Sequence, residues 1–361
     1  MKKPRAIEEA PPESDRFEDA PHPRETYSFI GHPSAEQEFL TAYRDNRLPQ
    51  SWIIGGREGI GKATLAWRVA RFLFANPDPN APAVQAARDL SVSREHPVAH
   101  RIEALSHGDL FLLRREWNEK AKPPKHFTEI RVDDVRRALD MFHHAAAEGG
   151  WRVCIIDPAD DLNRNAANAM LKLIEEPPPR CLFMFVSHRP GQIIPTIRSR
   201  SRMLNLEPLS DQNVVAVLRT LDDVWGDHDE RSIAEAAQRA GGSVRDALRL
   251  LTGSGLALTA RIEALVSRLP QVDWLKVHEL ADGLASREKT EDFEAALAGI
   301  YDWIDRRVRE DARAGNVRDL ARYAEVWEKI ATAARETEAL NLDRRPLILS
   351  IFSNLSEAAG H

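Results

Sequence analysis

Short apolar runs alternate with amphipathic helical stripes along the first two thirds of the chain. Uninterrupted apolar runs predict buried strands, which start at Trp52 and recur at residues 110–113, 152–157, 181–186 and 203–206. Apolar positions spaced three or four apart predict helices between them, around residues 34–48, 62–74, 134–142 and 163–176. Strands that alternate with helices are typical of an α/β fold with a mostly parallel sheet, whose ligands bind beyond the carboxyl ends of the strands.

From residue 208 onward the pattern is helical only. A group of helices is predicted up to about residue 258, and beyond it long stripes around Trp274, Ile300 and Trp327 repeat at helical spacing. Residues 1–26 are rich in proline and glutamate and lack periodicity, which predicts disorder. We therefore predict four segments: a disordered tail (1–26), an α/β core (27–207), a helical lid (208–258) and an all-helical domain (259–361).

The turn after the first predicted strand carries the strongest chemical signal in the chain. Its sequence, Gly56-Arg-Glu-Gly59-Ile-Gly61-Lys62, fits the phosphate-binding loop up to its last position. Glycines allow successive backbone N–H groups to converge on phosphate oxygens at a helix N-terminus, where the helix dipole also favours an anion. Lys62 would reach the β- and γ-phosphates. The strand before the turn and the helix after it favour this interpretation over an ordinary glycine-rich turn.

Two positions of the predicted site lack the groups that hydrolysis requires. Ala63 stands where a Ser or Thr hydroxyl would hold Mg²⁺, and Thr64 points about 100° further round the helix. Asp157, at the end of a buried strand, is the candidate metal-binding acid. The residue after it, Pro158, has no proton-accepting group, and losing a general base costs about 10²–10⁴ in rate. The sequence predicts weak nucleotide binding through backbone donors and no hydrolysis.

Composition narrows the class of protein. Hydrophobic residues at 43% and charged residues at 29% describe a globular protein with an ample core. No apolar run reaches the roughly 18 residues that span a membrane, and the N-terminus lacks the apolar segment of a secretion signal, so we expect a cytoplasmic protein. The net charge of −6 argues against attraction of the whole chain to nucleic acid, without excluding a local basic patch. Cys154 and Cys181 fall in predicted core strands and are expected to be reduced thiols.

Three stretches together resemble the bacterial clamp-loader branch of the AAA+ family, which serves DNA polymerase III. They are LPQSWIIGGREGIGKATLA, VCIIDPADDLNRNAANAMLKLIEEPPP and IIPTIRSRSR. The string NAANAMLKLIEEPPP is the most specific, because an amphipathic helix with a proline stop explains its apolar spacing but not its full spelling. The resemblance covers residues 30–255 well. It implies an AAA+ domain, a small helical lid and a helical collar through which five subunits form a ring.

The resemblance assigns roles position by position. The nucleotide-binding residues that it implies are Gly56, Gly59, Gly61, Lys62, Asp157, Ser187 and Arg245. Among them, Ser187 falls at the polar sensor of the γ-phosphate, and Arg245 lies in the lid motif that senses bound nucleotide. A glycine-rich turn between helices, capped by Ser243, is the alternative for that lid stretch. Ser199-Arg200-Ser201 resembles the Ser-Arg-Cys motif, whose arginine reaches into the nucleotide site of the neighbouring subunit.

The stretch after the phosphate-loop helix departs from the family pattern. Clamp-loader subunits of this type often carry a four-cysteine zinc module there, but residues 75–110 contain no cysteine. The histidines of that stretch, His96, His100 and His107, have no acid or thiol at ligand spacing. We therefore predict that the chain binds no zinc.

The function that the resemblance implies is that of a subunit that binds ATP weakly, does not hydrolyse it, and forms a rigid arm beside delta- and gamma/tau-type subunits. Together these would open a sliding clamp and place it on primed DNA. One alternative is an active ATPase, either of the gamma/tau type or acting alone, which Ala63 and Pro158 disfavour. The other is a stand-alone DNA-binding module, which the net negative charge disfavours.

Overall fold

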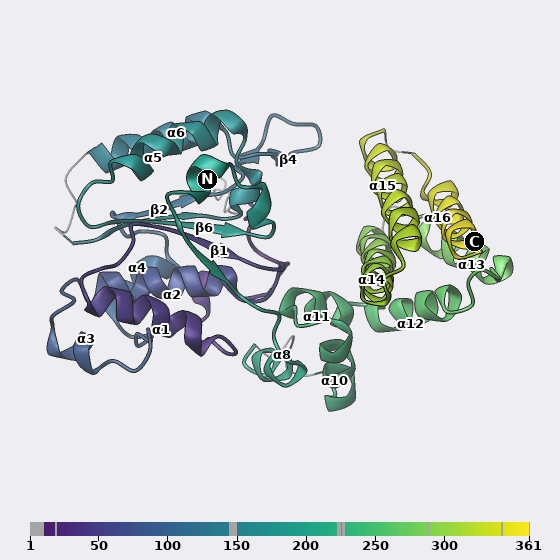
Figure 1. The fold of residues 1–361 in the computed structure, drawn as a ribbon, viewed down its shortest axis with the longest axis horizontal. Helices are drawn as coiled ribbons and strands as arrows, with labels where there is room; N and C mark the ends of the chain where they lie inside the picture. The colour runs from purple at the N-terminus through teal and green to yellow at the C-terminus, as the bar shows by residue number, and fades with distance from the viewer. Residues whose placement is uncertain are drawn as a thin grey trace, which may run out of the picture. The chain divides into compact units, whose positions relative to one another are not determined.

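The computed structural model describes residues 11–18, 20–143, 150–221, 225, 228–286, 289–340 and 342–360. The chain divides into two compact units, of which the first extends to Asp246 and the second starts at Ala247. The first unit holds the sheet, and the second is built of helices (Figure 1). The division falls within α11 (Val244–Leu251), so it cuts the predicted lid: α8 (Asp211–Leu218) and α10 (Glu230–Arg239) belong to the first unit.

A parallel sheet forms the centre of the first unit, in the strand order β2-β5-β6-β1-β7. The strands are β1 (Ser51–Gly55), β2 (Leu110–Leu113), β5 (Arg152–Ile156), β6 (Cys181–Ser187) and β7 (Arg202–Asn205). Every residue of β1 and β6 is buried, because helices cover both faces of the sheet. The predicted fold class, a parallel sheet flanked by helices and followed by a helical region, is confirmed.

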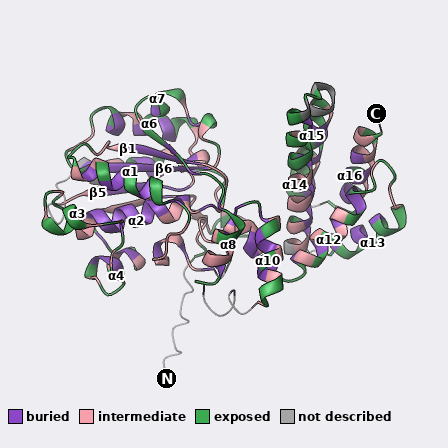
Figure 2. Cartoon of the chain, turned by 60° about the horizontal axis from the view of Figure 1, so that its bottom comes forward, coloured by how far each residue is buried: buried purple, intermediate pink, exposed green. Residues whose placement is uncertain are grey.

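Two layers of helices cover the sheet, with α5 (Val132–His143) and α6 (Arg164–Glu175) on one face and α1 (Pro33–Arg44), α2 (Lys62–Ala75) and α4 (Pro97–Glu103) on the other (Figure 1). Successive strand residues alternate between the two layers. Ile53 packs in the core beneath α5 and α6, whereas Trp52 and Ile54 pack in the core that includes α2. Figure 2 shows the central strands β1, β5 and β6 buried, and exposed residues on α1.

Short elements complete the first unit. They are η1 (Pro23–Glu25), α3 (Pro82–Ala86), the antiparallel pair β3 (Trp117–Asn118) and β4 (Lys125–His126), η2 (Ala159–Asp161), η3 (Pro190–Gln192) and α7 (Pro195–Arg198).

The N-terminal segment differs from the prediction of disorder. Residues 1–10 lie outside the described residues, but from residue 11 on the chain packs against the first unit, with His22 and Arg24 buried. Disorder was predicted because this segment has few apolar residues. Ion pairs hold it in place instead, and composition does not indicate them. Glu13 alone contacts Arg16, Arg24 and Arg114.

The second unit contains α12 (Gly255–Val266), α13 (Trp274–Leu284), α14 (Thr290–Ala314), α15 (Val317–Ala339) and α16 (Arg344–Ala359). Ile300 lies in its core, as its helical stripe predicts, but Trp274 is 44% exposed and Trp327 is 48% exposed. These two indoles therefore present apolar surface outward. Among the described residues, no helix combines the length and the apolar character that crossing a bilayer requires.

Candidate functional site

The predicted phosphate loop lies between the carboxyl end of β1 and the first turn of α2. Gly56, Gly59 and Gly61 all have positive φ angles, of 137°, 77° and 98°. Gly59 shows why a side chain is excluded there, since a Cβ atom would lie 2.3 Å from the Ser243 hydroxyl oxygen and 2.9 Å from the Arg245 backbone nitrogen. The loop backbone therefore has the conformation that a phosphate-binding turn needs, and it is packed against the start of α11.

Lys62 is brought to the site but points into its own loop. It is only 3% exposed, and its ammonium group donates a hydrogen bond to the backbone oxygen of Arg57. Burial lowers the pKa of Lys62 to about 8, against the opposing effect of Asp157 and Glu58. The amine that would reach a β- or γ-phosphate is thus already hydrogen-bonded within the protein.

Asp157 follows β5 and lies in the same electrostatic environment as Lys62. Burial raises the pKa of Asp157 to about 8, the nearby carboxylate of Asp15 adds to the rise, and Lys62 opposes it. Burial thus favours the uncharged form of this carboxyl group.

The remaining oxygen donors near Asp157 do not form a magnesium site. Ser187 is fully buried, and its hydroxyl donates to Asp160 at 2.9 Å. Asp160 also accepts hydrogen bonds from the backbone N–H groups of His188 and Arg189, at 2.6 and 3.1 Å. With Ala63 contributing no oxygen, these residues do not fit Mg²⁺, and we derive no step that uses the metal.

Two ion pairs, which the sequence did not reveal, join the phosphate loop to the start of the α11 helix. Glu58 lies 3.1 Å from the guanidinium of Arg245, and Arg57 lies 3.0 Å from the carboxylate of Asp246. Between them, the N–H of Val244 donates to the backbone oxygen of Gly59 at 2.8 Å. We call the two ion pairs the loop–lid clasp. Arg-Glu in the loop and Arg-Asp in the lid are complementary, but residues this far apart in sequence could be paired only once the fold was known.

Ser199 and Arg200 lie at the opposite edge of the sheet. The hydroxyls of Ser201 and Ser51 are 2.7 Å apart, and Arg202 is the neighbour of Trp52 in the register of β7 on β1. The turn that carries Arg200 therefore lies beside the amino end of β1. The phosphate loop follows the carboxyl end of the same strand. Four residue steps of a strand separate the two edges by roughly 13 Å. The structure therefore does not bring Arg200 to the phosphate loop of its own chain.

Arg200 is half exposed and has local partners. Its guanidinium lies 3.0 Å from the carboxylate of Glu175, and it donates to the Thr196 backbone oxygen and the Ser199 hydroxyl at 3.2 Å. The flanking arginines have different partners: Arg198 donates to the Gly191 oxygen, and Arg202 pairs with Glu38.

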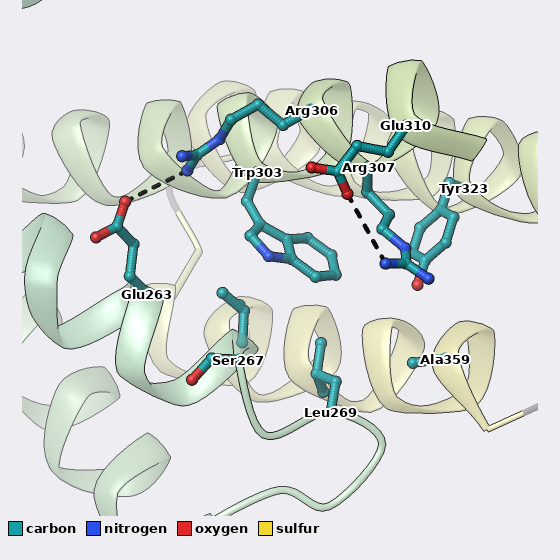
Figure 3. Close-up of a pocket in the computed structure, with 10 residues that line it drawn as sticks. Glu263, Ser267, Leu269, Trp303, Arg306, Arg307, Glu310, Tyr323 and Ala359 are labelled. Atoms are coloured by element: carbon teal, nitrogen blue, oxygen red, sulfur yellow. Dashed lines mark hydrogen bonds and ion pairs between the residues drawn. The ribbon is translucent and has the colours of Figure 1, made fainter. Parts of the chain in front are cut away.

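A pocket of about 420 Å³ in the second unit is a separate candidate. Trp303 and Leu269 contribute apolar walls, and arginines line its rim (Figure 3). Arg306 is paired with Glu263 at 3.4 Å, which reduces the positive charge that an anionic ligand would meet. The pocket carries no residue of the predicted site.

Comparison with known proteins gives consistent matches over the first unit. Residues 31–210 match the family model described as DNA polymerase III, delta subunit. The DNA polymerase III subunit δ′ of Pseudomonas aeruginosa is 33% identical over 200 residues, which are 55% of this chain and 55% of that protein. A γ subunit of Buchnera aphidicola is 26% identical over 231 residues, 62% of this chain and 58% of that protein. The matched segment thus spans little more than half of these relatives.

The solved structures that match this chain do so at low sequence identity and low TM-score. A γ-subunit-related protein of DNA polymerase III from Thermotoga maritima is 16% identical, with a TM-score of 0.38, and the alignment covers 89% of this chain and 99% of that one. A RuvB variant from the same organism is also 16% identical, with a TM-score of 0.39, over 74% of this chain and 75% of that one.

Proposed function

Because residues 31–210 of this chain belong to the DNA polymerase III clamp-loader family, we propose that the protein is the δ′ subunit of that assembly. In this role it binds ATP weakly, does not hydrolyse it, and acts as a rigid arm beside delta- and gamma/tau-type subunits in a five-subunit ring. The ring opens a sliding clamp and places it on primed DNA during replication.

The observation that carries the proposal is the set of internal partners around the phosphate loop. Lys62 donates to the loop backbone, Ser187 donates to Asp160, and Arg245 pairs with Glu58. These three side chains, which would contact a triphosphate, therefore already have partners within the protein. Ala63 and Pro158 remove the metal hydroxyl and the general base, and general-base loss alone costs about 10²–10⁴ in rate.

The positive role of the subunit rests on Arg200. Its guanidinium is exposed, stays charged and presents forked donors that match phosphate oxygens. Its position at the amino edge of the sheet keeps it away from its own phosphate loop and leaves it available to a neighbouring subunit. An arginine supplied across an interface is worth about 10³–10⁵ in rate, on the order of 4–7 kcal/mol, by stabilising charge on the transferring phosphoryl group.

An ATPase assay separates this proposal from its nearest rival. The γ relatives support the alternative of an active clamp-loader ATPase of the gamma/tau type. We expect the purified chain to show ATP turnover no higher than its Lys62→Ala variant. Turnover that Lys62→Ala abolishes would favour the active ATPase and contradict the δ′ role.

A binding assay tests the other rival, the stand-alone DNA-binding module. With a net charge of −6, the isolated chain should have only weak affinity for primed DNA. Titration of primed DNA at several salt concentrations measures both the affinity and the number of phosphates contacted. Tight binding with a steep salt dependence would favour the DNA-binding module.

A further inference from the structure

An N-terminal segment, residues 13–25, reaches from the sheet edge to the lid of the first unit. Glu13 is its anchor: it accepts two hydrogen bonds from Arg24, at 2.8 and 3.0 Å, and lies 2.9 Å from Arg114. Burial acts to raise the pKa of Glu13, but the hydrogen bonds from these arginines outweigh that effect and lower the pKa to about 2. Arg114 directly follows β2, so Glu13 is held at the carboxyl edge of the sheet, where ligands of this fold class bind.

Asp15 places a carboxylate within this edge. Its side chain is 1% exposed and lies 3.1 Å from the ring of His22, with Arg114 on its other oxygen. The His22 ring packs edge-on against Trp67 of α2, at 5.8 Å between ring centroids. The segment is anchored close to the candidate metal-binding acid. Arg114, the partner of Asp15, follows Leu113, whose backbone oxygen accepts a hydrogen bond from the N–H of Asp157 at 2.9 Å.

Phe17 forms the contact between the N-terminal segment and the lid. The guanidinium of Arg245 lies 5.0 Å from the centroid of the Phe17 ring, and the ring of Trp225 lies 6.4 Å away. Arg245 thus contacts an aromatic ring of the N-terminal segment as well as Glu58 of the phosphate loop. A cation over an aromatic face is stabilised electrostatically, so the contact favours keeping Arg245 where it is.

We propose that this N-terminal segment is a built-in closure of the phosphate-loop site, which lowers its affinity for ATP. Phe17 lies against Arg245, and Asp15 is held by Arg114, the residue after the backbone partner of Asp157. A bound nucleotide would approach both Arg245 and Asp157. The segment also adds two carboxylates, Glu13 and Asp15, that repel a triphosphate. ATP can therefore bind only after the N-terminal segment has moved out of the site. The free energy needed to break the ion pairs of the segment weakens the observed affinity for ATP. The inference rests on the proposed function in taking this loop as the nucleotide site.

ATP titration of full-length variants tests the closure. In the double variant Asp15→Asn with Phe17→Ala, we expect at least tenfold tighter ATP binding by calorimetry, and loss of that gain when Lys62→Ala is added. The matched control is Asp133→Asn with Leu275→Ala, which removes a carboxylate and a large apolar side chain at exposed positions outside residues 13–25. The control should bind ATP as the wild type does.

Hydrogen exchange on the wild-type chain supplies the second measurement, which does not depend on the variants folding. Saturating ATP should decrease protection of backbone amides in residues 13–25, because ATP and the N-terminal segment compete for the phosphate-loop site. Protection that is unchanged while ATP binds, or unchanged ATP affinity in a folded double variant, would overturn the closure. Neither outcome would touch the proposed function, which fails only if the wild-type chain hydrolyses ATP or Arg200 proves dispensable.

Discussion

One sheet carries two predicted functional regions of opposite character: the phosphate loop, predicted to bind nucleotide, and the Arg200 turn, predicted to act in catalysis at a neighbouring subunit. At the loop, Lys62 and Asp157 are 3% and 6% exposed, and the lid arginine is paired with Glu58. At the turn, the side chain of Arg200 is 41% exposed and its ion partner Glu175 is 46% exposed. A buried, internally satisfied site resists a ligand, whereas an exposed pair exchanges partners at little cost. The phosphate-loop end of the sheet is therefore paired internally, whereas the Arg200 turn presents an exposed cation.

The first way to break this comparison is to force the loop and lid apart. Gly59→Val places a branched side chain where φ is 77° and where even a Cβ would clash with the start of α11. Backbone strain and the lost packing should lower the free energy of unfolding by about 3 kcal/mol or more, measured by urea denaturation. Gly191→Ala is the control, because its Cβ would meet nothing within 4 Å. Equal stabilities for the two variants would mean that the loop is not packed on the lid.

The second prediction concerns the buried acid. The pKa of Asp157 is raised to about 8, so the unfolded chain loses this proton at lower pH than the folded chain does. The carboxyl group therefore destabilises the fold increasingly as pH rises from about 4 to 8. Asp157→Asn should gain stability relative to wild type with rising pH, by several kcal/mol at pH 9 and little at pH 4. Thermal melts at several pH values measure this, and a difference that is flat with pH would refute the buried, protonated carboxyl.

The third prediction sharpens the account of the loop–lid clasp. Glu58 is 48% exposed and Arg245 is 33% exposed, so their ion pair should contribute only about 0.5–1 kcal/mol. A double-mutant cycle with Glu58→Gln and Arg245→Gln measures that coupling directly. The coupling should shrink in 1 M salt. A coupling above about 3 kcal/mol would show that the pair is more strongly desolvated than its exposure indicates.

The smallest effect is expected at Glu175. Its exposed ion pair with Arg200 is worth at most about 1 kcal/mol, so Glu175→Gln should change ATP turnover of the reconstituted complex less than about fivefold. Glu176→Gln, one residue on, is the matched control. A loss as large as that caused by removing Arg200 would mean that Glu175 holds the arginine in its working position.

The sequence predicted what depends on local pattern. The strands and the phosphate-loop helix follow from apolar runs and motif spacing, and the structure places them as expected. The pattern could not supply contacts between distant segments. Arg57 and Glu58 find their partners at residues 245 and 246, and Glu13 finds one at Arg114, only because the fold brings these segments together.

The tail prediction was wrong for the described residues of 11–26 for the same reason. Disorder is inferred from low hydrophobicity, which measures how much apolar area a segment can bury. This segment is held instead by Glu13 and Asp15, which contact arginines, and by the edge-on packing of His22 on Trp67. Specific pairing of this kind leaves no periodic signal in the sequence.

The central claim is that this subunit completes a neighbour's nucleotide site through Arg200 while its own site stays inactive. The most direct test is ATP hydrolysis by the reconstituted clamp-loader complex carrying Arg200→Ala, with Arg198→Ala and Arg202→Ala as matched controls from the same turn. We predict that the complex assembles normally and that turnover at the adjacent subunit falls by about 10³ or more, with little rescue by Arg200→Lys and wild-type rates for both controls. Wild-type turnover and clamp loading by the Arg200→Ala complex would contradict the account.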